Sequence, residues 1–101
     1  MQLQAQDEKR LDALARANAV RSARAELKRD LAAGDVAIES VIAEPPAFAE
    51  QAKVFDLLRA VPGFGPWRTT RLLFHCQIPY EKTLRSLSDR QRSVLIAGLH
   101  S

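Results

Sequence analysis

The chain has 101 residues, of which 47% are hydrophobic and 27% charged, and its formal net charge is +3. This composition is too apolar for an intrinsically disordered protein, and chains usually divide into domains only beyond about 250 residues, so we expect a single domain, 1–101. The longest uncharged apolar run, 94–99, is far shorter than the roughly 20 residues of a membrane span. The polar N-terminus does not resemble a signal peptide, and a cytoplasmic protein is expected.

The charges are distributed unevenly along the chain. Residues 59–101 contain seven basic and two acidic residues, whereas residues 35–58 contain one basic and five acidic residues. A cationic half of this kind is what a surface that binds a polyanion requires. A solvated helix surface accounts for the same charges without any ligand.

A long helix is predicted first, over residues 7–33. This segment lacks Gly and Pro and is rich in Ala, Leu, Arg, Lys and Glu, which favour helix. Its larger apolar residues fall on one helical stripe: Leu11, Leu14, Val20, Leu27 and Leu31. Gly34 is suited to ending the helix. A helix of this length is expected to extend beyond a small domain at its N-terminal end.

The rest of the chain predicts shorter helices. Asp35 is a candidate N-cap for a second helix with Ile38, Val41 and Ile42 inward, and the sequence Glu44-Pro45-Pro46 ends it. The apolar pattern resumes over 47–61, with these residues predicted inward: Phe48, Val54, Leu57, Leu58 and Val61.

Three more helical segments are predicted after the turn at 62–66. The first covers 67–76 and is broken at 78–79, and a short helix over 80–85 follows. Ser88 and Gln91 have the spacing of a capping box, which begins a last helix. No stretch alternates long enough to form a strand, so an all-α fold is predicted.

The turn at 62–66 contains the sequence Gly63-Phe64-Gly65 between two predicted helices. Glycine permits positive φ and a close approach of the backbone to a partner, and the next helix begins with unpaired amides and a partial positive charge. Together they predict a seat for one phosphate, with Arg68 and Arg71 placed to hold its neighbours. Phe64 is expected to point inward and to pin the hairpin to the core. Glycine at a corner between helices can also serve a purely steric role. The basic residues that follow the turn favour the phosphate seat over this steric role.

Residues 54–73 resemble the helix-hairpin-helix family, in which such a hairpin holds a phosphate of double-stranded DNA. Motifs at 21–31, 41–42, 53–58, 61–65, 84–87 and 90–92, together with Ile78, resemble in order and spacing the actinobacterial integration host factor family. The resemblance covers about residues 11–99.

The resemblance implies a long N-terminal helix packed on a small multi-helix domain, 35–101. This domain contains a helix-hairpin-helix-like motif, related to the helix-two-turns-helix module, with the DNA-binding hairpin at 54–76. The implied function is non-enzymatic, nucleoid-associated binding and bending of double-stranded DNA, largely through its backbone. Phage integrase or recombinase complexes are implied as further partners, and we expect a monomer without cofactor.

The same resemblance carries the family's DNA contacts over to six residues: Gly63, Gly65, Arg68, Lys82, Thr83 and Arg85. Four neighbours in and after the hairpin complete the predicted DNA-binding set: Phe64, Pro66, Trp67 and Arg71. Pro66 and Thr83 depart from the family pattern, because each replaces a basic residue. Trp67 has two interpretations. A lone tryptophan is more often a core anchor, which we expect here, and the alternative is a residue that stacks on sugar or wedges at a base step.

Some alternatives stay open. The basic residues on one side of the long helix suit either a solvated face, which is slightly favoured, or a second DNA contact: Arg21, Arg24 and Lys28. An RNA- or protein-binding helical module fits the same fold. A DNA glycosylase does not, because the chain lacks the length for a base-flipping pocket and has no lysine shortly after the hairpin. The chain's single cysteine, Cys76, excludes an internal disulfide, and no His or Cys spacing suggests a metal site.

Overall fold

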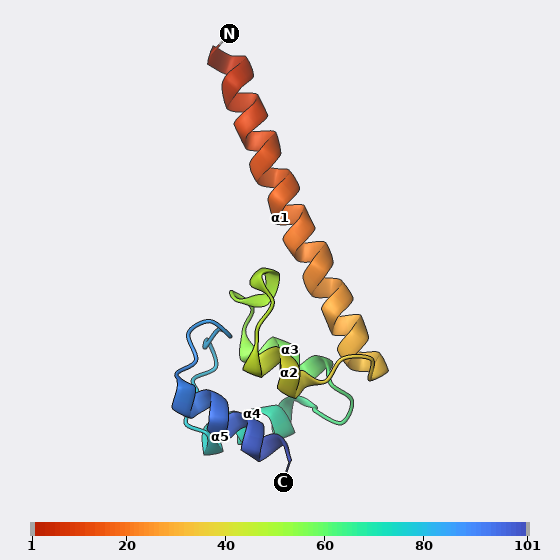
Figure 1. The fold of residues 1–101 in the computed structure, drawn as a ribbon, viewed down its shortest axis with the longest axis vertical. Helices are drawn as coiled ribbons and strands as arrows, with labels where there is room; N and C mark the ends of the chain where they lie inside the picture. The colour runs from red at the N-terminus through yellow and green to blue at the C-terminus, as the bar shows by residue number, and fades with distance from the viewer. Residues whose placement is uncertain (1, 101) are drawn as a thin grey trace.

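Helices are the regular elements of the computed structural model, which describes the backbone of residues 2–100 and the side chains of residues 8–100. In chain order they are α1 (Gln2–Ala33), α2 (Ile38–Ala43), the 3₁₀ turn η1 (Ala47–Ala49), α3 (Val54–Ala60), α4 (Pro66–His75) and α5 (Asp89–Leu99) (Figure 1). Between residues 2 and 100 there is no strand, and one isolated antiparallel bridge joins Lys53 to Thr83. The all-α prediction is therefore confirmed.

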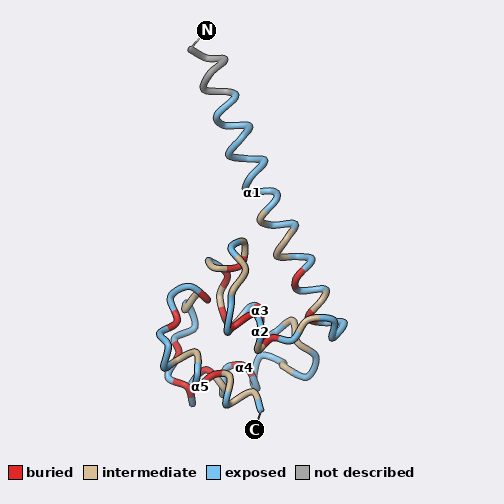
Figure 2. The backbone as a smooth tube through the Cα atoms, in the orientation of Figure 1, coloured by how far each residue is buried: buried red, intermediate tan, exposed pale blue. Residues whose placement is uncertain are grey.

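The long helix α1 projects away from a group of short helices (Figure 1), and the molecule measures 60 × 27 × 23 Å. Only the C-terminal part of its apolar stripe is covered: Leu27 and Leu31 are 6% and 2% exposed, whereas Leu11 and Leu14 are 64% and 53% exposed. The stripe is therefore covered only where the domain reaches α1, and among the side chains described from residue 8 its N-terminal members are exposed. Figure 2 shows α1 as exposed from residue 8 to residue 19, and the predicted overhang is confirmed.

The end of α1 is set by Gly34, which has a φ of +80°. The amide of Gly34 donates to the carbonyl of Leu31 (3.3 Å) and that of Asp35 to the carbonyl of Asp30 (2.9 Å), the two bonds of a Schellman motif. Asp35 therefore belongs to the end of α1, and the prediction that it caps α2 is wrong. The N-cap of α2 is Ala37, whose side chain makes no capping bond.

The segment 47–61 is not the single helix that its apolar pattern predicts. It divides into η1 and α3, because the backbone between them pairs with a distant segment. The amides of Leu84 and Arg85 donate to the carbonyls of Ala52 (3.0 Å) and Glu50 (2.9 Å), and the amide of Val54 donates to the carbonyl of Lys82 (3.0 Å). The same bonds overturn the helix predicted at 80–85, since these backbone groups are used across the fold and not within a helix.

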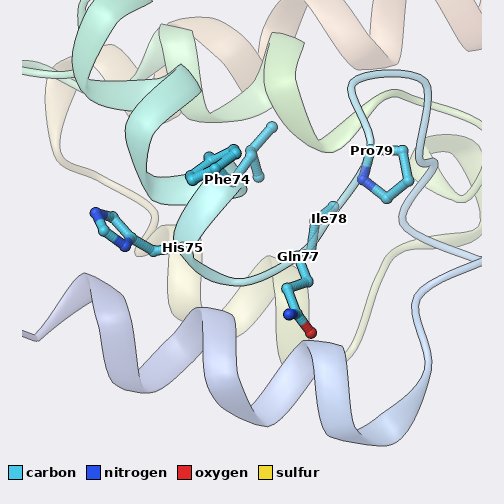
Figure 3. Close-up of a pocket in the computed structure, with 6 residues that line it drawn as sticks. Phe74, His75, Gln77, Ile78 and Pro79 are labelled. Atoms are coloured by element: carbon cyan, nitrogen blue, oxygen red, sulfur yellow. The ribbon is translucent and has the colours of Figure 1, made fainter.

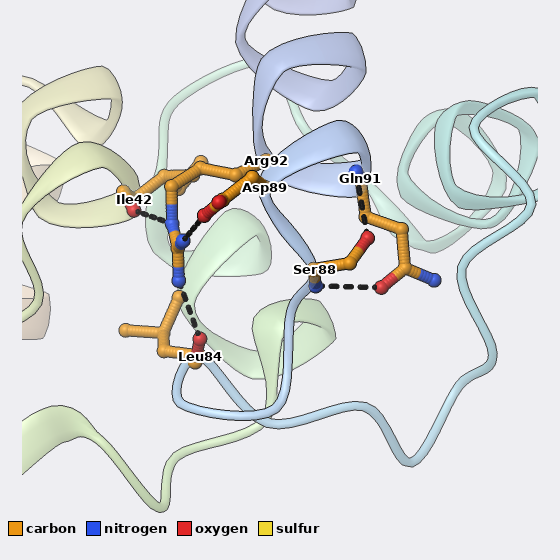
Figure 4. Close-up of polar contacts among 6 residues, drawn as sticks. All are labelled: Ile42, Leu84, Ser88, Asp89, Gln91 and Arg92. Carbon is orange, nitrogen blue, oxygen red and sulfur yellow. Dashed lines mark hydrogen bonds and ion pairs between the residues drawn. The ribbon is translucent and has the colours of Figure 1, made fainter.

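The start of α5 agrees with the prediction. Ser88 Oγ accepts from the Gln91 amide and Gln91 Oε1 accepts from the Ser88 amide, both at 3.0 Å (Figure 4). One turn later, Arg92 donates to the carbonyls of Ile42 (2.8 Å) and Leu84 (3.2 Å). Arg92 thus ties α5 to the end of α2 and to the loop at 80–87.

The core lies among α2, α3, α4, α5 and the end of α1. Its fully covered apolar members come from α2, η1, α3, α5 and the loop before α5: Ile42, Ala49, Leu57, Leu58, Leu84 and Leu95. In the part of the chain that the structure describes, no helix is both long enough and apolar enough to cross a membrane. The packing of α3 against α4 fixes the two ends of the turn at 61–65, where the candidate site lies.

Candidate nucleic-acid interface

The turn between α3 and α4 is a tight corner built on Pro62 and Gly63. The amide of Phe64 donates to the carbonyl of Val61 (3.1 Å), and Gly63 in the third position has a φ of +86°. A type II turn requires positive φ at that position and favours proline just before it. Gly65 is extended, with a φ of −71°. Gly63 is therefore the residue in which positive φ requires glycine.

The hairpin leads directly into the first turn of α4. Gly65 is the N-cap, Pro66 is the first helical residue, and the carbonyl of Gly65 accepts from the Thr69 amide (3.1 Å). The amides of Trp67 and Arg68 come too early in the helix to have an intrahelical partner. Pro66 has no amide N–H, so this helix start has one free donor fewer than a helix start without proline.

Thr69 is a positioning residue that the sequence reasoning missed. It is fully buried, and its Oγ1 donates to the carbonyl of Gly65 at 2.9 Å. The hydroxyl thereby fixes the N-cap residue of α4 at the point where the hairpin ends. A threonine four residues after a helix N-cap is a pattern that permits this bond, because Ser and Thr donate to the carbonyl of residue i−4.

Phe64 and Arg68 form a stacked pair on the hairpin. The Arg68 guanidinium lies over the Phe64 ring, 4.1 Å from its centroid, and Nη1 donates to the carbonyl of Gly63 at 3.3 Å. Phe64 is half-buried and lies outside the core cluster. The prediction that Phe64 pins the hairpin to the core is therefore wrong, since the turn stands out from the core and the ring is covered by Arg68.

The expectation that Trp67 anchors the core is wrong. Its side chain is 81% exposed, because the inward face of α4 is occupied by Thr69, Leu73 and the following Cys76. Trp67 instead lines an open groove of about 730 Å³ together with Phe64, Arg68, Arg71, Leu72, His75 and Gly98. The structure thus places Trp67 and both predicted arginines around one groove next to the hairpin.

The second predicted group lies elsewhere on the molecule. In Figure 1 the hairpin is at the right of the group of short helices and the loop at 80–87 is at the left. In this loop Arg85 is exposed, Lys82 is half-buried, and the Thr83 hydroxyl donates to Ser86 Oγ at 2.9 Å. The structure therefore does not bring Lys82, Thr83 and Arg85 together with the hairpin.

The basic residues of α1 divide into two kinds. Arg24 is half-buried, and its Nε donates to the carbonyl of Phe48 at 2.9 Å, so it ties α1 to η1. Arg21 and Lys28 are exposed. The solvated-face interpretation therefore fails for Arg24, which has a structural partner.

Cys76 lies at the end of α4 and is buried. Burial raises the pKa of its thiol, because the charged thiolate loses hydration. The residue thus behaves as a small apolar side chain. Within the described residues, no three His, Cys, Asp or Glu side chains gather as metal ligands would.

Comparison with known proteins finds relatives that share much of the sequence and a solved structure that shares the fold. The chain is 38% identical over 92 residues to proteins named Integration host factor from Mycolicibacterium smegmatis and Mycobacterium tuberculosis, covering 89% of this chain and 88% of each relative. The fold matches a solved structure described as sIHF bound to an 8-base-pair palindromic DNA, with a TM-score of 0.73 and 28% identity. That match covers 79% of this chain and 92% of the other. No model of a protein family matches the chain.

Proposed function

The chain belongs to the integration host factor family of these mycobacterial relatives, and on this premise we propose that it binds and bends double-stranded DNA as a non-enzymatic protein of the nucleoid. The observation that carries the proposal is the corner at Gly63. It places the amide-bearing start of α4 beside Arg68 and Arg71. Helix starts of this kind bind phosphate, because their amides lack partners and the helix dipole adds partial positive charge.

The charge around the hairpin supports a polyanionic ligand. No Asp or Glu occurs between residues 57 and 80, whereas Arg59, Arg68 and Arg71 do. Contacts made by backbone amides and arginines with phosphates do not read base identity. Binding is therefore expected to depend strongly on salt and weakly on sequence.

A second contact region supports bending. The loop at 80–87, whose sequence contains Lys82 and Arg85, lies on the other side of the group of short helices from the hairpin (Figure 1). A straight duplex that contacts the hairpin does not also contact the loop on the opposite side of the domain. Curvature of the duplex brings both regions into contact with phosphates, and sequence-dependent flexibility then determines how much the curvature costs.

Gly65 is the position at which the proposal is tested most directly. A side chain fits there, because its φ is in the ordinary range and no atom lies within 4 Å of an added Cβ. Gly65→Glu places a carboxylate in the phosphate seat, and we expect DNA affinity to fall at least about tenfold through charge repulsion. The measurement is fluorescence anisotropy with a labelled duplex of random sequence.

Gly65→Gln is the matched control, because it has the same shape and no charge. Far-UV circular dichroism of both variants verifies the helical fold. Equal affinities of the two variants would refute the hairpin as the phosphate seat. Competition with structured RNA tests the alternative polyanion, since A-form grooves present phosphates differently, and stronger competition by RNA than by duplex DNA contradicts the proposal.

A further inference from the structure

The most exposed large apolar side chain among the described residues is Trp67, at 81%. Tryptophan combines a large apolar surface with one N–H group, and such residues are enriched where a partner covers them. Trp67 is the second residue of α4. Because Cα–Cβ bonds in a helix tilt toward its N-terminus, the indole leans toward the hairpin and not along the helix.

The groove beside Trp67 has the character of a surface that receives a base. Phe64 and Leu72 give it apolar walls, and Arg68 and Arg71 line it with positive charge. Aromatic side chains in a positively charged groove are the arrangement on which nucleic-acid bases stack. A protein partner of opposite charge would meet the same arginines, but the phosphate seat that adjoins the groove favours a nucleotide.

Resting on the proposed function, we propose that Trp67 stacks on a partly unstacked base next to the phosphate held by the hairpin. A base inside a fully stacked duplex has no free face, so this contact needs a step that opens. The protein is then selective for flexible or mismatched steps although its phosphate contacts carry no sequence information. Apolar side chains that enter opened steps also kink the duplex, which couples this contact to bending.

Phe74 provides a matched control on the same helix. It is 80% exposed and lies seven residues after Trp67, two turns and about 10 Å further along the same side. It lines two pockets, neither of which contains an arginine. The first is lined by Leu73, His75, Gln77, Ile78 and Pro79 (Figure 3), and the second by Phe55, Thr70, Leu73, Ile78 and Tyr80. In Figure 3 the Phe74 ring points away from α5, toward which Gln77 points. Replacing either residue by alanine therefore removes one exposed aromatic ring from α4, but only Trp67 lies next to the hairpin.

The chain has one tryptophan, so its intrinsic fluorescence reports on Trp67 alone. We would titrate the wild-type protein with a fully paired duplex and with the same duplex carrying one central mismatch. Anisotropy of a label on the DNA measures binding independently. We expect tryptophan emission to fall and acrylamide quenching to weaken as the label saturates, and the mismatched duplex to bind at least fivefold more tightly, the lower end of what one stacked base contributes.

Two variants complete the test. Trp67→Ala is expected to lose the preference for the mismatch and to keep the salt slope of wild type, because no phosphate contact is removed. Phe74→Ala is expected to keep the preference. If the anisotropy of the labelled DNA reaches saturation without any change in tryptophan emission, the stacking contact is overturned and DNA binding is not. If the anisotropy does not saturate even at low salt, both the stacking contact and DNA binding are overturned. If Phe74→Ala loses the preference for the mismatched duplex, that preference belongs to α4 in general and the role of Trp67 is overturned.

Discussion

A single hydroxyl, that of Thr69, links the buried side of α4 to the corner that faces solvent. It donates to the Gly65 carbonyl at 2.9 Å while the residue itself is fully buried. A buried donor without a partner loses its hydration without compensation, so this bond is needed for stability as well as for geometry. The shape of the candidate site therefore depends on a residue that is itself buried.

Replacing Thr69 by valine keeps the volume and removes the hydrogen bond. We expect Thr69→Val to lower the free energy of unfolding by about 1 kcal/mol, as measured by urea denaturation. Thr70→Val is the control, because Thr70 is exposed and surface changes of this kind stay within about 0.5 kcal/mol. If both variants unfold at the same urea concentration, the Thr69 hydroxyl contributes nothing to the corner.

Local spacing predicts some residues of the candidate site and misplaces others. The positive φ of Gly63 and the position of Arg68 and Arg71 along one groove both follow from distances of a few residues along the chain. Trp67 and Phe64 were misplaced because burial depends on which neighbouring element covers a side chain. That information lies in the packing of α4 on the rest of the domain and not in the residues next to them.

The same division holds for whole elements. The end of α1 at Gly34 and the start of α5 at Ser88 are fixed by groups within one or two turns, and both were predicted. The break between η1 and α3 was not, because its cause is pairing with residues about thirty positions later, at Lys82, Leu84 and Arg85. An apolar pattern cannot reveal a partner so distant in sequence.

The capping box of α5 provides a test at this scale. Ser88→Ala removes the acceptor of the Gln91 amide, and loss of such a cap costs about 1 kcal/mol of stability. Ser93→Ala is the comparison within the same helix, since Ser93 is exposed and alanine favours helix. We expect urea denaturation to give a lower midpoint for Ser88→Ala only, and equal midpoints would mean that α5 starts without help from its cap.

At the scale of the whole molecule, the chain combines a packed group of short helices with a helix that is largely free of it. The side chains from residue 8 to residue 19 are all exposed, and among the described side chains of α1 the buried ones are Leu27 and Leu31. Most of the stability of a helix in a protein comes from packing of its apolar face. The free half of α1 is therefore expected to contribute little to folding.

Removal of residues 1–17 tests this separation. The shortened chain begins at Asn18, a good N-cap residue for what remains of α1, and loses three basic and three acidic residues, so its net charge is unchanged. We expect its free energy of unfolding to stay within about 0.5 kcal/mol of the full chain, and the salt slope of DNA binding to change by less than about 0.9, the value for one phosphate. Leu27→Ala in the full chain is the contrasting change, because it empties a buried position and is expected to cost about 2–5 kcal/mol. A shortened chain as unstable as Leu27→Ala would show that the projecting half of α1 is part of the folding unit. A salt slope reduced by the equivalent of several phosphate contacts would show that this half of α1 contacts DNA.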